Sequence, residues 1–123
     1  MKKLLFISIF FILLTKVTYA EYSLSCLTEA QFKFFDKEKW ETNIRPVTLV
    51  IKDKTLEYVS KINPKPSILT IIEQDKNTIV GIRTIKFKDK IAINILSFDK
   101  IEKRMTMMAV NDLGLTVYSG ICN

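Results

Sequence analysis

The feature that most limits the fold of this 123-residue chain is a repeated alternation of apolar, often β-branched residues with polar ones. One example places Val47, Leu49 and Ile51 on one side of a two-residue period, a pattern typical of strands with one buried face. Charged turns, or turns containing proline or glycine, separate the alternating runs, and we identify no helix long enough to connect parallel strands. The sequence therefore predicts an all-β fold of antiparallel strands in meander order.

About eight short strands are expected, and most are separated by charged turns. Their predicted ranges are 22–27, 47–52, 55–60, 67–73, 78–87, 91–98, 101–110 and 115–122. Eight strands in about 100 residues suit a small closed barrel or a strongly curved sandwich, and closure removes exposed sheet edges. In an up-and-down barrel the first strand pairs with the last, so residues 22–27 should lie beside residues 115–122.

Two details of the pattern concern which side chains point inward. Ile91, Ile93 and Ile95 form the cleanest alternating row in the chain, and we expect this row inside the barrel. The alternation slips within the strand that contains Gly81, which predicts a β-bulge at residues 81–84.

Residues 28–40 allow two interpretations. Thr28 and Gln31 fit a capping box at the start of a short helix. Phe32 and Phe34 instead alternate as in a strand, followed by a charged turn. We favour the hairpin, because the surrounding segments are strands.

The first twenty residues have the layout of a secretory signal peptide. Two lysines precede an apolar run at residues 4–14, and the small Ala20 ends a more polar tail, so we expect cleavage after Ala20. The run is short for a transmembrane helix, because eleven residues at about 1.5 Å each cover about 17 Å of a hydrocarbon core about 30 Å thick. The alternatives are an uncleaved anchor and a lipoprotein acylated at Cys26. We expect residues 21–123 to form one exported domain, periplasmic or secreted.

Export to an oxidising compartment favours a disulfide between the two cysteines, Cys26 and Cys122. Two cysteines in a small exported domain most often pair, and neither has the C-x-x-C companion or histidine that redox or metal chemistry would need. They are 96 residues apart, so a disulfide would close almost the whole mature chain. In the chain-entropy model a loop of about 100 residues contributes about 4–5 kcal/mol. If the first and last strands pair, the two Cα atoms could meet at the spacing of about 5.5–6 Å that a disulfide needs.

The net charge of +6 falls once the signal peptide is removed, because three of the 19 cationic residues lie there; the remaining 16, against 13 acidic residues, give +3. Arg45, Arg83 and Arg104 are scattered singly, whereas nucleic-acid binding favours clustered arginines with aromatic residues between them. We therefore expect a solvated cationic surface, no nucleic-acid partner, no stable membrane insertion after cleavage, and a monomer.

The chain contains no histidine, which excludes most zinc sites and the histidine-assisted nucleophiles. Paired cysteines would offer no thiol nucleophile, and the three glycines form no phosphate-binding motif. A pair of carboxylates is the one catalytic option left, but the acidic residues lie in turns or among lysines. We expect a protein that is not an enzyme and that carries no metal and no cofactor.

Four side chains are candidates for binding contacts: Trp40, Tyr58, Met108 and Tyr118. In a strand, Met105 and Met107 would share one face and Met108 would take the other, which places Met108 at a rim or on the surface. Methionine adapts to irregular contact surfaces. The three aromatic residues are of a kind that more often fills the core or the ends of a barrel than binds a partner.

The pattern of Tyr22 and Cys26, then Trp40, then the terminal Tyr118-Ser119-Gly120-Ile121-Cys122 resembles small uncharacterised exported bacterial or phage-encoded proteins. In those proteins a terminal G-x-C pairs with an early cysteine, and the resemblance implies no assigned activity. The chain is also similar to the periplasmic inhibitors of C-type lysozyme, which are small eight-stranded barrels with an early cysteine. Their S-G-x-x-Y loop has no counterpart, because no tyrosine follows Ser119-Gly120.

The leading hypothesis is an exported, non-enzymatic binding protein whose rim or outer face engages a protein or a cell-envelope component. The alternatives are a lipocalin-like carrier of a small apolar ligand and a carboxylate-dependent hydrolase. An interior filled by side chains would argue against the carrier, and the lack of two carboxylates in one cleft would argue against the hydrolase.

Overall fold

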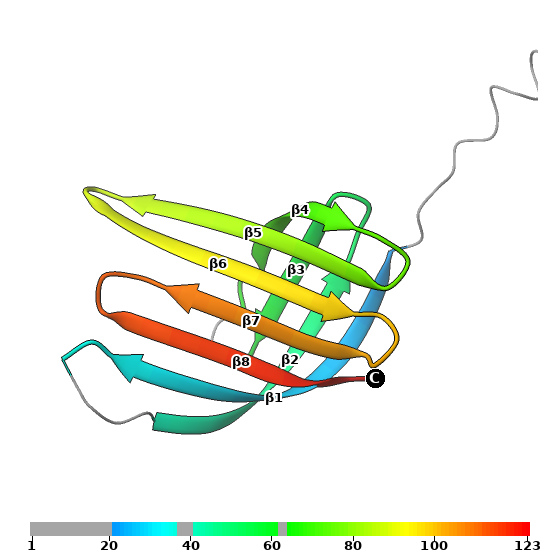
Figure 1. The fold of residues 1–123 in the computed structure, drawn as a ribbon, viewed down its shortest axis with the longest axis horizontal. Helices are drawn as coiled ribbons and strands as arrows, with labels where there is room; N and C mark the ends of the chain where they lie inside the picture. The colour runs from blue at the N-terminus through cyan, green and yellow to red at the C-terminus, as the bar shows by residue number, and fades with distance from the viewer. Residues whose placement is uncertain (1–20, 37–40, 62–63) are drawn as a thin grey trace, which may run out of the picture.

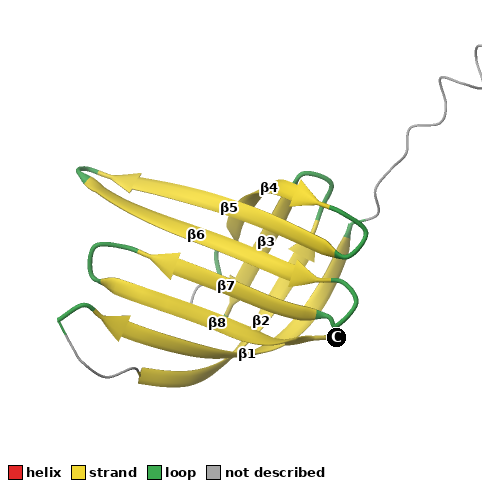
Figure 2. Cartoon of the chain, in the orientation of Figure 1, coloured by secondary structure: helices red, strands yellow, loops and turns green. Residues whose placement is uncertain are grey.

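The computed structural model describes residues 21–36, 41–61 and 64–123. In these residues the chain forms an eight-stranded antiparallel barrel in which each strand pairs with its neighbours in sequence and the first strand pairs with the last (Figure 1). The strands are β1 (Tyr22–Phe34), β2 (Glu41–Ile51), β3 (Thr55–Ser60), β4 (Ser67–Gln74), β5 (Thr78–Phe87), β6 (Lys90–Asp99), β7 (Arg104–Val110) and β8 (Gly114–Cys122). The described residues contain only strands and loops (Figure 2), and none forms a helix that could cross a membrane. The predicted fold class is confirmed.

The barrel closes between β1 and β8, as the sequence predicted. Cys26 lies directly opposite Cys122 in the β1–β8 register, and the two form a disulfide with their Cα atoms 3.9 Å apart. Ser25 and Asn123, one position further along, exchange two backbone hydrogen bonds of 3.0 and 2.8 Å. The cysteines therefore occupy a non-hydrogen-bonded pair, in which facing Cα atoms are closer than in a hydrogen-bonded pair, and this explains a spacing below the expected 5.5–6 Å.

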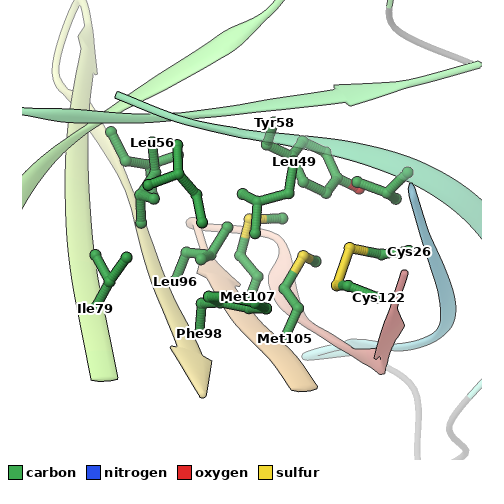
Figure 3. Close-up of a cluster of buried hydrophobic side chains, with 13 residues drawn as sticks. Cys26, Leu49, Leu56, Tyr58, Ile79, Leu96, Phe98, Met105, Met107 and Cys122 are labelled. Atoms are coloured by element: carbon green, nitrogen blue, oxygen red, sulfur yellow. A yellow bond between two sulfur atoms is a disulfide. The ribbon is translucent and has the colours of Figure 1, made fainter. Parts of the chain in front are cut away.

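The core fills the half of the barrel that contains the disulfide (Figure 3). Val47, Leu49 and Ile51 point inward as predicted and are buried. Opposite them lie buried side chains of the later strands, among them Leu69, Ile79, Leu96, Phe98, Met105 and Met107. Because these large side chains meet across the barrel, this half has the filled interior of a small barrel.

The expected inward row on β6 is wrong: Ile91, Ile93 and Ile95 point outward and are exposed. The inner face of β6 instead carries the alternate residues, which end in the buried Leu96 and Phe98. Apolar side chains occur on both faces of this strand, so a two-residue period cannot show which face is inside. The register with β7, in which Leu96 faces the buried Met107, decides the orientation.

The other half of the barrel is open along one side, because β3 and β4 are shorter than the strands that flank them. In the described chain, pairing with β3 covers only residues 47–51 of β2, and pairing with β4 covers only residues 79–82 of β5. Pro46 has no backbone N–H to give to a ladder, so pairing with β3 stops naturally at this residue. Residues 41–46 and 83–87 thus border an open end, to which the long β5–β6 hairpin also extends (Figure 1).

Two further expectations need correction, and one is confirmed. The β-bulge lies in β4, where the register shifts between Ile71 and Glu73 opposite Gly81 and Val80, and not at residues 81–84. The strand favoured over a helix after Thr28 is confirmed, because β1 continues unbroken to Phe34. β7 begins at Arg104 and not at residue 101, because the Asp99 carboxylate accepts hydrogen bonds from the backbone of residues 101 and 102 and holds a turn there. The expected signal peptide and its cleavage site lie outside the described residues.

Candidate functional site

A continuous apolar surface lies on the outside of β6 and β7. Ile91, Ile93 and Ile95 are 51, 39 and 41% exposed, and Met108 and Val110 are 44 and 37% exposed. The pairing places Ile93 beside Val110 and Ile95 beside Met108. We call these five residues the outer apolar face. Contiguous apolar patches on a soluble protein are commonly sites of interaction.

The outer apolar face continues across β8 to a hollow over the β1–β8 pairing, which we call the β1–β8 hollow. Val117 of β8 lies opposite Met108 and also lines this hollow, whose volume is about 570 Å³. Leu27, Ile44 and Ile121 also line it, and each is more than half exposed. The apolar surface therefore crosses the neighbouring strands β2, β1, β8, β7 and β6.

Charged residues of both signs lie around this surface, and Asp99 of β6 is paired with Arg104 of β7. Lys33, Lys86 and Arg104 lie on the outer faces of β1, β5 and β7 by the strand register. Glu29 is the one described carboxylate that lines the β1–β8 hollow. Arg104 has Glu102 at 3.7 Å, but both side chains are exposed, so this pair neutralises little of the local field.

A second candidate lies inside the barrel, at the base of the open end. We call it the Arg45 layer: Phe32, Arg45, Tyr58 and Tyr118. The Arg45 guanidinium carbon lies 4.9 Å from the centre of the Phe32 ring, and Nη1 donates to the Tyr118 hydroxyl at 3.4 Å. The Tyr118 and Tyr58 rings meet edge to face with centroids 5.8 Å apart. β1 holds the arginine backbone in place, because the Thr28 hydroxyl donates to the Arg45 carbonyl at 2.7 Å.

The electrostatics of this layer follow from burial. Burial raises the pKa of Tyr58 well above its ordinary value of 10.0, the neighbouring Tyr118 phenol raises it further, and Arg45 opposes the shift. Tyr58 is 8% exposed, so a phenolate would be poorly solvated there. Tyr58 is therefore a neutral hydrogen-bonding group at physiological pH, near the Arg45 guanidinium.

The predicted contact residues separate into different environments. Tyr58 belongs to the buried core and Tyr118 packs against it, so the structure brings these two together in the Arg45 layer. Met108 lies on the outer apolar face, with Met105 and Met107 buried on the other side of β7, as predicted. Trp40 lies outside the described residues.

Sequence reasoning missed the role of Arg45 and treated it as one of three scattered arginines. A local signal was available: Arg45 lies two residues before Val47 and so shares the inner face of β2 with Val47, Leu49 and Ile51. It also missed the outer apolar face, because the β6 isoleucines were assigned to the interior.

The described residues offer little for hydrolytic or metal chemistry. Three surface hollows lined wholly by described residues contain one carboxylate, Glu29, whereas glycoside hydrolysis needs two acids across one site. No group of three potential metal-ligating side chains occurs in the described parts of the chain. Asp75, which has a lowered pKa, accepts backbone hydrogen bonds from Asn77 and Thr78 and caps a turn.

Comparison with known proteins gives no further assignment. No protein-family model, no curated protein and no solved structure matches this chain significantly.

Proposed function

We propose that this chain is an exported, non-enzymatic binding protein that engages another protein through the outer apolar face and the adjoining β1–β8 hollow. The observation that carries the proposal is the row of exposed Ile91, Ile93 and Ile95, which the pairing register joins to Met108 and Val110. A disulfide that closes the barrel supports export to an oxidising compartment. The half of the interior around Leu49, Leu96 and Met105 is filled, which disfavours a carrier with its apolar ligand there.

The surroundings of the apolar surface favour a partner of particular chemistry. Lys33, Lys86 and Arg104 border it, so a partner with an apolar patch and an acidic rim would be complementary. A membrane surface is disfavoured, because the apolar surface has no Trp or Tyr among its defining residues, and these residues mark membrane interfaces.

A photo-crosslinking experiment tests this proposal. We replace Ile93 with benzoylphenylalanine, purify the exported protein, and irradiate it in envelope and secreted fractions of its host. We expect a discrete adduct with one other protein, identified by mass spectrometry. Because the contact is apolar with a cationic border, the adduct yield should fall about tenfold or more when Met108→Ser removes a neighbouring contact, and it should fall as salt is raised.

A matched control places the same crosslinker at Thr48, which is exposed on the outside of β2. Equal yields of the same adduct from both positions would contradict the proposal. So would a homodimer as the sole product, or recovery of the protein on sedimented vesicles of anionic phospholipid without any protein adduct.

A further inference from the structure

The Arg45 guanidinium lies inside the barrel and has fewer hydrogen-bond partners than donors. The Arg45 Nε is buried and has no hydrogen-bond partner, and the bond from its Nη1 to the Tyr118 hydroxyl is long, at 3.4 Å. Within the described chain no carboxylate lies within ion-pair distance of Arg45. Buried polar groups almost always have partners, and a guanidinium presents five donors in a fixed planar arrangement.

The contacts that Arg45 makes leave one edge of its guanidinium without an acceptor among the described residues. Phe32 covers its face, and Tyr118 takes the donor on the Nη1 side. The remaining edge, formed by Nε and Nη2, is the geometry that receives both oxygens of a carboxylate. The arginine is thus held from two sides while its bidentate edge has no acceptor among the described residues.

The inner face of the open end suits an anion with an apolar body. By the alternation of the strands, Arg83 of β5 and Asn94 of β6 lie on this face and are directly paired. Ala92 and Ala109 are small residues on the same inner face. At the rim, the Asp112 carboxylate forms an ion pair with Lys90 at 2.8 Å. Among the residues of this face whose side chains the structure describes, none is an unpaired carboxylate.

We propose that the open end of the barrel binds a small organic carboxylate, with the Nε–Nη2 edge of Arg45 as its anchor and the rings of Phe32 and Tyr118 beside its apolar body. This site is on the inside of the barrel and is independent of the protein-binding surface on the outside. Arg83 adds a second positive charge on the same inner face. The occupant is identified by its chemistry: one planar oxyanion that accepts two parallel hydrogen bonds, attached to an apolar group.

The test is a titration of the purified exported protein followed by two-dimensional ¹H–¹⁵N NMR, with sodium octanoate, sodium benzoate and sodium phosphate as separate probes. We expect saturable shifts with octanoate or benzoate at Phe32, Thr116 and Tyr118. In Arg45→Gln the dissociation constant should rise about tenfold or more, because both donors to the carboxylate are lost. Arg45→Lys keeps the charge without the planar fork and should give an intermediate value.

Lys76→Gln is the control, because it removes one positive charge from an exposed turn; its dissociation constant should stay within about twofold of the wild type. The dispersion of each spectrum shows whether a variant is folded. If Arg45→Gln does not fold, the comparison is made with Arg45→Lys. Unsaturable shifts, or equal affinity in folded Arg45 variants, would overturn the proposal. Phosphate binding as tightly as the two carboxylates would overturn it as well, because the site would then select charge alone.

Discussion

At the scale of single residues, closure of the barrel depends on a glycine. Gly120 lies on the inner side of β8, opposite Thr28 of β1, and two residues from the disulfide. A Cβ at this position would overlap the Leu27 carbonyl oxygen and lie 2.7 Å from both the Leu27 carbonyl carbon and the Thr28 Cα. These are backbone atoms of the paired strand, so they can move only if β1 and β8 separate.

We therefore predict that Gly120→Ala destabilises the protein by about 2–3 kcal/mol or more, at the upper end of overpacking effects. Gly81→Ala is the matched control. Its Cβ would lie 3.0 Å from Leu56 Cδ1, the flexible end of a side chain, and 3.2 Å from Leu69 Cβ. A shift of a few tenths of an ångström relieves both contacts, and we expect a cost of about 1 kcal/mol. Urea unfolding followed by circular dichroism measures both variants. A Gly81 variant less stable than the Gly120 variant would refute this account of closure.

At the scale of elements, β6 carries apolar residues on both faces, one of which packs into the core while the other is exposed. Leu96 and Phe98 pack into the core, whereas Ile93 and Ile95 lie on the outer apolar face. A one-residue change of register would exchange these faces. The neighbours decide between them, because β7 places the buried Met107 opposite Leu96 and the exposed Met108 opposite Ile95.

The orientation of β6 predicts a large difference between two truncations of similar size. Leu96→Ala should cost about 2–5 kcal/mol, since it creates a cavity in a fully buried site. Ile93→Ala removes a side chain that is 39% exposed and should cost about 1 kcal/mol or less. Thermal and urea unfolding of the two variants provide the comparison. Equal costs, or a larger cost for Ile93→Ala, would mean that the isoleucine row is inside after all.

At the scale of the whole molecule, the barrel is closed at one half and open at the other. The disulfide joins the first and last strands in the closed half, where the core is filled. Strands of unequal length leave residues 41–46 and 83–87 without β3 or β4 as neighbours in the described chain. This division provides a stable body at one half and, at the other, an inner face that carries the Arg45 layer.

Reduction of the disulfide should lower the free energy of unfolding of the whole domain and not only loosen one strand. The bond spans 96 residues, so its loss restores conformational freedom to nearly the entire unfolded chain, and we expect a loss of about 2–5 kcal/mol. Urea unfolding with and without reductant measures this effect. A Cys26→Ala/Cys122→Ala variant should be insensitive to reductant. A wild-type midpoint that stays constant after a thiol assay shows complete reduction would contradict the prediction.

The sequence by itself determined the antiparallel meander, the pairing of first and last strands, the disulfide, and the inward row of Val47, Leu49 and Ile51. These properties follow from local alternation, turn chemistry and cysteine spacing, which are readable along the chain. Only the tertiary structure decided which face of β6 is inside and placed the bulge in β4. It also placed Arg45, because the environment of that side chain depends on where β3 and β4 end and on which rings the neighbouring strands bring to it. Both candidate binding surfaces arise from such relations between strands, and no single segment of the sequence contains them.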